Sequence, residues 1–525
     1  MAPRISRFVL DSHLLCCRGL FYFLRQSKEA FLCIQFIRIC LFLQNQANTK
    51  DYTHYPLTLE LLADIKTPLE VLKLFKEQNK PCFLLESVIS KEQWGRHTFL
   101  GFDPVLEITG LDGQIYENGQ AIKSTIPQKY LRKLLAQYRV PKLINLPPFI
   151  GGLVGYFGYD YFKYVETKLK LDAKNPEALN DFNLMLFTKV VCFDHTQQKI
   201  YLIANVLLTD LTAQYQKICQ ELQDLAELLT NQHAKRKFTG ELLAPLQPRF
   251  TKERFTQMIQ KAKNYIYEGD IFQVVLSNCL SAPFQGSLLD TYRQLKLLNP
   301  SPYLFYVQTS DLEVIGASPE TLVKLENETL YTYPLAGTRP RGKTLQEDLA
   351  LENELLQDEK ELSEHNMLVD LGRNDLGKVC HFGTVEVEKY LNIERFSHVM
   401  HIGSIIRGII QNDKDALDTV NAILPAGTLS GAPKFRACEI INELEDVKRG
   451  IYGGEIGYID FSGNLDLCIA IRIIYQKNQK IFIQSGAGIV ADSNAAKEYQ
   501  ECVNKAKATV KALELAGGNS NDLTH

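Results

Sequence analysis

The chain has 525 residues, a formal net charge of −3, 45% hydrophobic residues and 23% charged residues. This balance is typical of an ordinary globular protein and gives no reason to expect a nucleic-acid partner. The length allows roughly three domains, or one large body of two lobes. The 12 cysteines are scattered and most stand in apolar runs, so we expect buried reduced thiols and a reducing compartment, the cytoplasm.

Residues 1–54 differ from the rest of the chain, and we treat them as an N-terminal extension outside the fold. Their apolar run, 31–43, contains Arg38 and is shorter than the roughly 20 residues of a membrane span, so no membrane segment is predicted. The run also lacks the cleavage site of a signal peptide. Two interpretations stay open: a transit peptide, which would place the protein in a plastid or another organelle, or a start codon assigned too early.

Residues 55–245 have the pattern of a first, strand-rich region. Thr67 followed by Pro68 predicts the capped start of an amphipathic helix that runs to residue 78. The glycine-rich stretch 151–160 does not match GxGxxG, and we interpret it as backbone packed closely against aromatic rings. Strands are expected at 81–87, 98–101, 105–110, 186–194 and 199–205, and a helix at 209–232.

The polar segment 235–249 is interpreted as a linker to a second region, 246–515, which is followed by a disordered tail at 516–525. Gln273 lies in an expected buried strand, where an amide must find a partner, so a structural hydrogen bond and a site role are both open. Strands are expected at 270–277, at 303–308, 313–317, 321–325 and 329–333 as a meander, and at 384–390, 403–408, 455–461, 467–475 and 480–484. Helices are expected at 251–268, 346–370, 415–423, 433–445 and 494–515. Because the strands are mostly consecutive, we predict an α+β fold with large antiparallel sheets.

Acidic side chains share one face of the expected helix 346–370. Glu361, Glu364 and His365 are three and four residues apart, which places them on the same side. Such faces are common on solvated helices, and this interpretation stays open. A second pair with the same spacing, Glu498 and Glu501, favours a divalent cation between the carboxylates, and hard oxygen ligands favour Mg²⁺ over zinc.

Three further segments and one arginine have the character of anion sites. Residues 334–342 carry two arginines beside a glycine turn, although such arginines are more often surface charges. Residues 424–434 open a helix with a hydroxyl and a lysine, and the glycines of 485–488 allow close backbone approach. Arg472 stands in an apolar strand, where its planar fork would pair with a carboxylate of a ligand or of a structural Asp or Glu. Together these features predict a Mg²⁺-dependent enzyme that acts on a small dicarboxylate.

Five long motifs then carry a resemblance to a known family. They are PLAGTRPRG at 334–342, KELSEHNMLVDLGRND at 360–375, PAGTLSGAPK at 425–434, GGEIGY at 453–458 and QSGAGIVADS at 484–493. The chain resembles the chorismate-utilising enzymes over about residues 55–515, and among them the large, aminating subunits of anthranilate synthases. The resemblance implies a two-lobed α+β body with antiparallel sheets packed face to face and helices outside.

The resemblance also implies a lyase reaction, the first step of tryptophan biosynthesis. Chorismate would gain an amino group at ring C2 and lose its C4 hydroxyl, and its enolpyruvyl group would leave as pyruvate to give anthranilate. The chain shows no glutaminase signature, so the ammonia would come from a separate glutamine amidotransferase subunit. We expect a heterotetramer of two large and two small subunits.

The resemblance assigns site residues position by position. For catalysis it implies Glu320 as general acid, His401 in pyruvate elimination, and Thr428, Lys434 and Gln273 in the same pocket. For chorismate it implies Gly337, Thr338, Tyr452, Arg472, Gly486, Ala487 and Gly488. For Mg²⁺ it implies Glu364 and Glu501 as ligands, with Glu361 and Glu498 acting partly through water. For the feedback inhibitor L-tryptophan it implies Ser87, Pro302, Tyr303 and Leu304.

Two positions separate this chain from related enzymes. Gln273 stands where water-adding relatives carry a lysine, and Ala336 stands where aminodeoxychorismate synthases carry one, so both favour anthranilate as the product. Two alternatives stay open: an aminodeoxychorismate synthase large subunit of the folate pathway, and a catalytically silent tryptophan-binding regulatory subunit.

Overall fold

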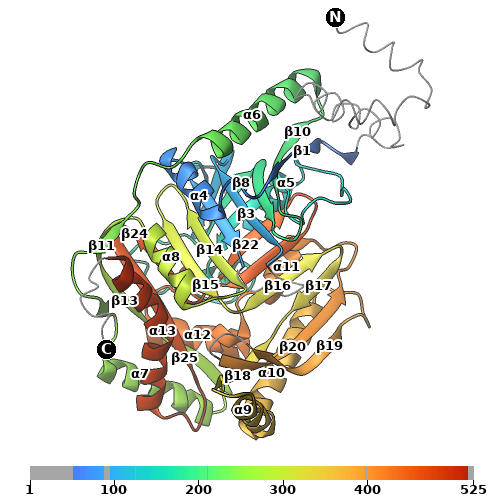
Figure 1. Cartoon of the computed structure of the whole chain (residues 1–525). Coiled ribbons are helices and arrows are strands. Elements are labelled where there is room, and N and C mark those ends of the chain that lie inside the picture. The colour runs from blue at the N-terminus through green and yellow to red at the C-terminus, as the bar shows by residue number, and fades with distance from the viewer. Residues whose placement is uncertain are drawn as a thin grey trace, which may run out of the picture.

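The computed structural model describes Ile39 and residues 51–517, apart from 88–94, 124–125, 210 and 396–398. Apart from Ile39 and the last few residues before 55, the expected N-terminal extension lies outside the described residues, and so does the tail from residue 518. Two large antiparallel sheets form the middle of the molecule, and most helices lie outside them (Figure 1). No helix in the described part of the chain is long and apolar enough to cross a membrane.

The first sheet joins strands from both ends of the chain. It contains β1 (His54–Leu62), β2 (Cys82–Glu86), β3 (His97–Phe102), β9 (Lys189–Asp194), β10 (Lys199–Leu207), β11 (Gly240–Leu242), β12 (Gln247–Pro248), β13 (Gln273–Gly286), β14 (Tyr303–Gln308), β15 (Glu313–Ser318), β21 (Gly431–Ala432), β24 (Ile473–Lys477) and β25 (Lys480–Ile489). Their order is β1-β10-β9-β3-β2-β14-β15-β24-β25-β13-β11, and β12 and β21 also pair with β13.

The second sheet is built in the same mixed way. It contains β4 (Leu106–Leu111), β5 (Gln114–Glu117), β6 (Gln120–Ala121), β7 (Gly152–Phe157), β8 (Phe182–Phe187), β16 (Thr321–Glu326), β17 (Thr329–Thr332), β18 (Leu335–Pro340), β19 (Glu386–Arg395), β20 (Val399–Ile409), β22 (Glu455–Asp460) and β23 (Leu465–Ile469). Their order is β18-β20-β17-β16-β23-β22-β7-β8-β4-β5-β6, and β19 also pairs with β20. Both sheets therefore run across residue 246, the expected boundary between the two regions.

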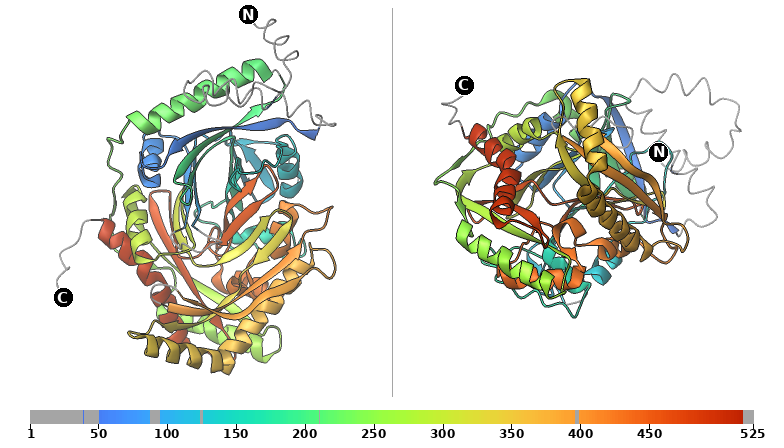
Figure 2. Two further views of the ribbon diagram at one scale, coloured as in Figure 1. Left: turned by 45° about the vertical axis from the view of Figure 1, so that its right-hand side comes forward. Right: turned by 90° about the horizontal axis from the view of Figure 1, so that it is seen from below.

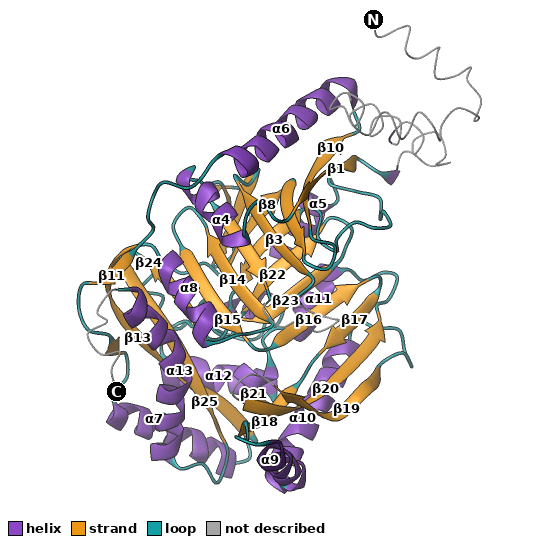
Figure 3. Cartoon of the chain, viewed as in Figure 1, coloured by secondary structure: helices purple, strands orange, loops and turns teal. Residues whose placement is uncertain are grey.

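Most helices lie around this pair of sheets, as the colouring of Figure 3 shows, but residues of α7 (Lys252–Tyr267), α11 (Ala416–Ile423) and α12 (Lys434–Glu445) belong to the core that contains the facing rings of the two sheets. The helices are α4 (Pro68–Glu77), α5 (Pro127–Leu135), α6 (Leu211–Asn231), α7 (Lys252–Tyr267), α8 (Leu289–Leu298), α9 (Leu345–Gln357), α10 (Glu359–Gly377), α11 (Ala416–Ile423), α12 (Lys434–Glu445) and α13 (Ala495–Ala516), with the short 3-10 helices η3 (Tyr159–Tyr164) and η4 (Gly427–Leu429). The α+β class predicted from the sequence is confirmed.

Aromatic rings join the two sheets across the core. The ring of Phe83 in β2 lies 4.8 Å from that of Phe187 in β8, and the ring of Phe99 in β3 lies 5.7 Å from that of Tyr458 in β22. A second core packs α4, α6, α8 and α13 on the other face of the first sheet. Figure 2 shows this arrangement from the side, with the green helix α6 lying across one end of the strands.

Local sequence signals explain several elements. The side chain of Thr67 accepts a hydrogen bond from the Glu70 N–H, and the Glu70 carboxylate accepts one from the Thr67 N–H, so the predicted start of α4 is confirmed as a capping box. The expected single helix 346–370 is two helices. Asp358 has extended backbone (φ −75°, ψ 101°) and its carboxylate caps the N–H groups of Lys360 and Glu361, so the chain ends α9 there and begins α10.

Four sequence predictions about strands are wrong. The four strands from 303 to 333 are not one meander but two hairpins, β14–β15 in the first sheet and β16–β17 in the second. The expected strands 186–194 and 467–475 are likewise divided, the first between β8 in the second sheet and β9 in the first sheet, and the second between β23 in the second sheet and β24 in the first sheet. The expected linker 235–249 contains β11 and β12, which pair with the long strand β13 because its edge offers unpaired backbone groups.

The glycine-rich stretch 151–160 forms β7 between two other strands, which confirms close backbone packing there. At Gly155 (φ 154°) an added Cβ would stand 2.0 Å from the carbonyl oxygen of Asn183 on β8. No side chain fits that gap unless the two strands move apart.

Gly155→Ala should therefore lower the free energy of unfolding by about 3 kcal/mol, because overpacking and backbone strain add. Urea unfolding measures the change. Gly377→Ala at the end of α10 is the control, since an added Cβ meets nothing within 4 Å, and its stability should be unchanged or rise by up to about 1 kcal/mol. Equal stability of Gly155→Ala and the wild-type protein would contradict this packing.

Candidate active site

Among the passages of the chain from one sheet to the other, two are hydrogen-bonded side by side. The first, Pro319–Glu320, joins β15 to β16, and the second, Ala470–Arg472, joins β23 to β24. The Ile469 N–H donates to the Glu320 carbonyl over 3.0 Å, and the Ala317 N–H donates to the Arg472 carbonyl over 3.2 Å. The Ser318 hydroxyl donates to the Ile469 carbonyl over 2.7 Å. This double crossing places the backbones of Glu320 and Arg472, two residues singled out from the sequence, in neighbouring passages.

Glu320 lies in a cavity where its acid form is favoured. Burial raises the pKa of the Glu320 carboxyl to about 7, although the Thr428 hydroxyl and the charge of Lys505 act in the other direction. The Thr428 Oγ1 donates to Glu320 Oε1 over 3.2 Å. The carboxyl therefore holds a proton in a large fraction of molecules at neutral pH, as a general acid must.

Arg472 is a partly buried cation without a carboxylate partner in the part of the chain that the structure describes. The salt bridges among the described residues include none to Arg472, so the structural ion pair left open from the sequence is not found there. Burial lowers the pKa of its guanidinium. Its φ of 54° is in the left-handed region, which is strained for a residue other than glycine. A guanidinium with no carboxylate partner among the described residues is suited to bind a carboxylate ligand.

The glycines of β25 lie against two predicted site residues, Tyr452 and Gln273. A Cβ added at Gly486 would stand 2.9 Å from the Tyr452 Oη, and one added at Gly488 would stand 2.9 Å from the Gln273 Nε2. Gln273, in β13, is buried. The polar atoms of Tyr452 and Gln273 thus approach the β25 backbone only because residues 486 and 488 have no side chain.

His401 has a defined tautomer. Its Nδ1 lies 2.7 Å from the carbonyl oxygen of Gly337, which can only accept, so Nδ1 carries the proton and donates it. Burial and the charge of Arg472 lower the pKa of His401, which keeps Nε2 unprotonated and able to accept a proton. Gly337 (φ 63°) and Thr338 stand in a bulge where the register of β18 against β20 shifts.

The four predicted metal-site carboxylates come from α10 and α13. Burial, and then the charges of Glu361 and Glu501, raise the pKa of Glu364. Burial and the charge of Glu501 raise the pKa of Glu498. Glu501 also forms an ion pair with Lys505, 2.6 Å apart. His365 does not share their face, because it is fully buried and its Nε2 lies 2.7 Å from the Ser404 hydroxyl.

Lys434 is separated from Glu320 by an intervening carboxylate. Its Nζ donates to Asp375 over 3.2 Å and to the Ile423 carbonyl over 2.9 Å. Asp375 lines the cavity that contains Glu320 and Thr428, whereas Lys434 lines a neighbouring surface groove. Arg339 and Arg341 pair with Asp358 and Asp348, so they act as structural charges.

The four residues expected to bind an inhibitor line one pocket between the sheets. Ser87, Pro302, Tyr303 and Leu304 meet there because β2 pairs with β14. The Tyr303 hydroxyl donates to Asp466 over 2.7 Å, and Asp466 lines the same pocket. Asp466 was missed in the sequence, where it stands in an ordinary strand pattern.

Comparison with known proteins places these features in a family. The chorismate binding enzyme family matches residues 80–511. Anthranilate synthase component 1 of Acetivibrio thermocellus is 44% identical over 89% of this chain and 97% of its own length. That of Aquifex aeolicus is 43% identical over 89% and 96%.

Solved structures share the fold. Anthranilate synthase component I of Streptococcus pneumoniae superposes with a TM-score of 0.68 and 38% identity, over 81% of this chain and 94% of its own. The menaquinone-specific isochorismate synthase of Escherichia coli superposes with a TM-score of 0.66 over 92% of this chain and all of its own, at 20% identity. The second likeness concerns the fold alone.

The raised pKa of Glu320 has a consequence for stability. The folded protein resists ionising this carboxyl, so stability is greatest below the ordinary pKa near 4.5 and falls as pH rises to about 7. Glu320→Gln removes this cost and should stabilise the protein by up to about 3 kcal/mol at pH 8, with little effect at pH 4.5. Urea unfolding at both values measures it. The exposed Glu241→Gln is the control, and a pH-independent difference for Glu320→Gln would contradict the assignment.

Proposed function

The chain belongs to the chorismate binding enzyme family, and we infer that it is a lyase that converts chorismate to anthranilate. In the complete reaction ammonia adds, water and pyruvate leave, and the ring becomes aromatic. The observation that carries this proposal is the double crossing. It holds Glu320, whose pKa is raised by burial to about 7, in a passage hydrogen-bonded to that of Arg472, a cation without a carboxylate partner among the described residues.

Arg472 binds a carboxylate of chorismate. Its guanidinium has no partner among the described salt bridges, and Tyr452 lies close enough for their charges to interact. The N–H groups of residues 486–488 add donors, and the two glycines, Gly486 and Gly488, leave the backbone open to close approach. A dianionic substrate thus meets a cation and backbone dipoles that are held in place before it binds.

Glu320 then supplies the proton for the first half of the reaction. As ammonia forms its bond to ring C2, the C4 hydroxyl departs with the Glu320 proton as water. The Thr428 hydroxyl, 3.2 Å away, stabilises the carboxylate that remains. A pKa of about 7 suits this exchange, since the group must give up a proton and regain it near neutral pH.

His401 serves the second half, in which the enolpyruvyl group leaves as pyruvate. Its Nδ1–H is held by the Gly337 carbonyl, so Nε2 is the nitrogen that accepts a proton from the ring. Loss of that proton with cleavage of the carbon–oxygen bond makes the ring aromatic. Lys434 stays outside this scheme, because Asp375 holds it.

Two observations weigh against the alternative functions. Gln273 and Ala336 are the neutral residues that favour anthranilate over the products of water-adding and folate-pathway relatives. The acid, the guanidinium and the carboxylates are all present in arrangements that support chemistry, which disfavours a silent regulatory subunit. The product assay below distinguishes both alternatives from the proposed function.

Mg²⁺ fits the carboxylates of α10 and α13. Burial is the main cause of the raised pKa values of Glu364 and Glu498, and the neighbouring charge of Glu501 adds to both; a divalent cation would favour the charged form of these carboxylates. No three His, Cys, Asp or Glu side chains of the described residues are arranged to hold a metal, but Mg²⁺ in enzymes often binds through one or two carboxylates. Glu364 and Glu501 would hold it, with Glu361 and Glu498 acting partly through water. Mg²⁺ would neutralise a substrate carboxylate and orient the ring.

The protein works with a second component. The relatives are named component 1, which implies a component 2, and we propose a glutamine amidotransferase that supplies ammonia in an assembly of two large and two small subunits. The eight cysteines of the described residues are buried free thiols, which supports a reducing compartment, the cytoplasm. We propose that L-tryptophan binds in the pocket lined by Ser87 and Tyr303 and inhibits the enzyme from there.

The purified chain, given chorismate, Mg²⁺ and ammonium at alkaline pH, should form fluorescent anthranilate and pyruvate in equal amounts. Glutamine should replace ammonium only when the amidotransferase subunit is added. Fluorescence and chromatography identify the products. Aminodeoxychorismate as the final product, or no turnover, would reject the proposal in favour of the corresponding alternative.

Glu364→Gln should raise the Mg²⁺ concentration needed for half-maximal activity at least tenfold, because one of two direct carboxylate ligands is lost. Mg²⁺ titrations of activity measure this. The same change at Glu359, on the first turn of α10, should leave the titration unaltered. Identical Mg²⁺ titrations for wild type and Glu364→Gln would contradict the assignment of Glu364 as a Mg²⁺ ligand.

Ser87→Ala should weaken tryptophan inhibition by about tenfold, as expected from the loss of a buried hydrogen bond to a ligand, while activity without tryptophan stays within twofold of wild type. Inhibition curves with ammonium as donor test this. Unchanged inhibition would exclude Ser87 from the pocket.

A further inference from the structure

A fully buried ion pair lies behind the proposed active site. The Arg449 side chain is 1% exposed and that of Glu445, at the end of α12, is 4% exposed. Their groups meet through two hydrogen bonds, Nε to Oε2 over 2.9 Å and an Nη to Oε1 over 2.5 Å. Neither residue was singled out in the sequence. A buried pair of this kind costs desolvation, so its other contacts decide what it does.

The guanidinium of Arg449 holds two backbone carbonyls from separate segments. One Nη donates to the Leu429 carbonyl and the other to the Val275 carbonyl, each over 2.6 Å. Leu429 ends the 3-10 helix η4, whose middle residue is Thr428. The orientation of the hydroxyl that donates to Glu320 thus depends on a turn tied to Arg449.

The same pair also supports the substrate-binding side. The Glu445 Oε1 accepts hydrogen bonds from the Ser277 N–H and hydroxyl, over 2.8 and 3.0 Å. Ser277 in β13 is the register partner of Gly486 in β25. The Arg449 guanidinium lies over the ring of Tyr452, 5.9 Å from its centre, and over that of Tyr159 at 4.7 Å.

We propose that the Arg449–Glu445 pair is a positioning device that aligns Thr428 with Glu320 and holds Tyr452 and Gly486 at the substrate. Neither residue touches the reacting atoms. Only an arginine satisfies this geometry, because its planar fork reaches the carboxylate and both carbonyls at once. The inference rests on the proposed function, since it names the residues that align the same site.

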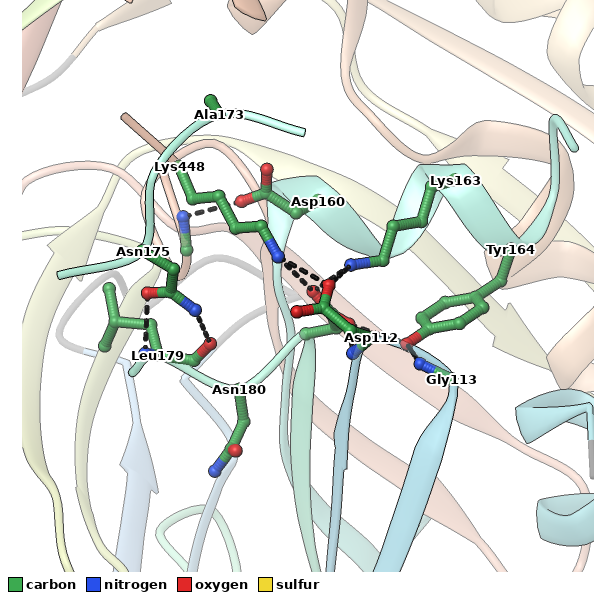
Figure 4. Close-up of polar contacts among 12 residues, drawn as sticks. Asp112, Gly113, Asp160, Lys163, Tyr164, Ala173, Asn175, Leu179, Asn180 and Lys448 are labelled. Atoms are coloured by element: carbon green, nitrogen blue, oxygen red, sulfur yellow. Dashed lines mark hydrogen bonds and ion pairs between the residues drawn. The ribbon is translucent and has the colours of Figure 1, made fainter. Parts of the chain in front are cut away.

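The neighbouring residue Lys448 offers a matched control. Its side chain is 5% exposed, and its Nζ lies 2.7 Å from Asp112 and 3.9 Å from Asp181. Figure 4 shows that Lys448 points into a separate polar network with Asp112, Lys163 and Tyr164. Lys448→Met therefore also removes a buried cation, from a network that contacts none of the proposed site residues.

The test compares E445Q/R449Q, Arg449→Lys and Lys448→Met with wild type. The double change removes both charges, so no lone buried charge remains. At temperatures where circular dichroism shows each protein folded, E445Q/R449Q should lower kcat/KM for chorismate at least tenfold, since small misalignments at a reacting centre have large effects. Lys448→Met should stay within twofold. Arg449→Lys keeps the cation but cannot reach both carbonyls, so it should also lose at least fivefold.

The pH dependence distinguishes positioning from general destabilisation. Thr428 and Lys505 lower the pKa of Glu320, and Asp375 of α10 faces the same cavity. If E445Q/R449Q releases Thr428, the alkaline limb of kcat moves to higher pH, and a carbon-13 NMR titration of Glu320, assigned with Glu320→Gln, moves the same way. Lys448→Met should leave both unchanged.

Wild-type kinetics and an unmoved Glu320 titration in folded E445Q/R449Q would overturn the proposal. Equal losses in Lys448→Met, or full activity of Arg449→Lys, would overturn it too. The rates are measured as chorismate consumed, whichever product is formed. If the wild-type enzyme forms a product other than anthranilate, the proposed function is refuted, but the comparison of the variants with wild type still holds. The NMR titration needs no turnover and reports on alignment in either case.

Discussion

The paired crossing of the chain between its two sheets is the constraint on which the site depends. A chain can leave one sheet and enter the other only where it stops pairing with its neighbours. Here two such passages satisfy one another's backbone groups, through the Ile469, Ala317 and Ser318 hydrogen bonds. Glu320 and Arg472 stand in these gaps, outside regular strand pairing. The cost is visible at Arg472, whose backbone is in the left-handed region.

The two proposed sites share this part of the molecule. Tyr303, in the proposed inhibitor pocket, is the register partner of Ser318, and Asp466 and Cys468 of the same pocket lie on β23 just before the second passage. Strand β23 continues directly into the passage that contains Arg472, and β14 is hydrogen-bonded to β15, which ends just before Glu320. If the pocket binds an inhibitor as proposed, its effect on the acid therefore needs no long relay.

Sequence patterns predicted most elements of this fold but not their partners. Strand alternation located β14 to β17 to within a residue at their ends, yet gave no sign that Pro319 and Glu320 pass between sheets. The apolar run around Arg472 read as one strand because periodicity does not record a single left-handed residue. Asp358 could have been recognised as a cap inside the expected helix 346–370, since an aspartate before a run of acidic residues is a common helix start.

The candidate site was predicted in the same uneven way. A long motif identified the β25 glycines, whereas Glu320 was assigned from the family resemblance and Arg472 stood out as a charge in an apolar strand. The fold places Glu320 and Arg472 in two passages that are hydrogen-bonded to each other. Lys434 matched a motif equally well, but its neighbour in space is Asp375, which no spacing along the chain reveals. Glu445 and Arg449 stand in no motif that suggests chemistry. Their importance arises from three segments far apart in sequence that meet at one guanidinium.

The mixed composition of the two sheets bears on how the protein is made. Strand β7 pairs on one side with β8, but its other neighbour, β22, begins only at Glu455. In the first sheet, β2 likewise lacks one of its neighbours until β14 has been synthesised. During synthesis the N-terminal half therefore carries strands whose hydrogen-bonding edges stay open until distant residues emerge, a state prone to wrong pairing. A chain released before the C-terminal strands are made would expose unpaired strand edges, so the cell must shield or degrade it. Such a fragment would not be a smaller enzyme.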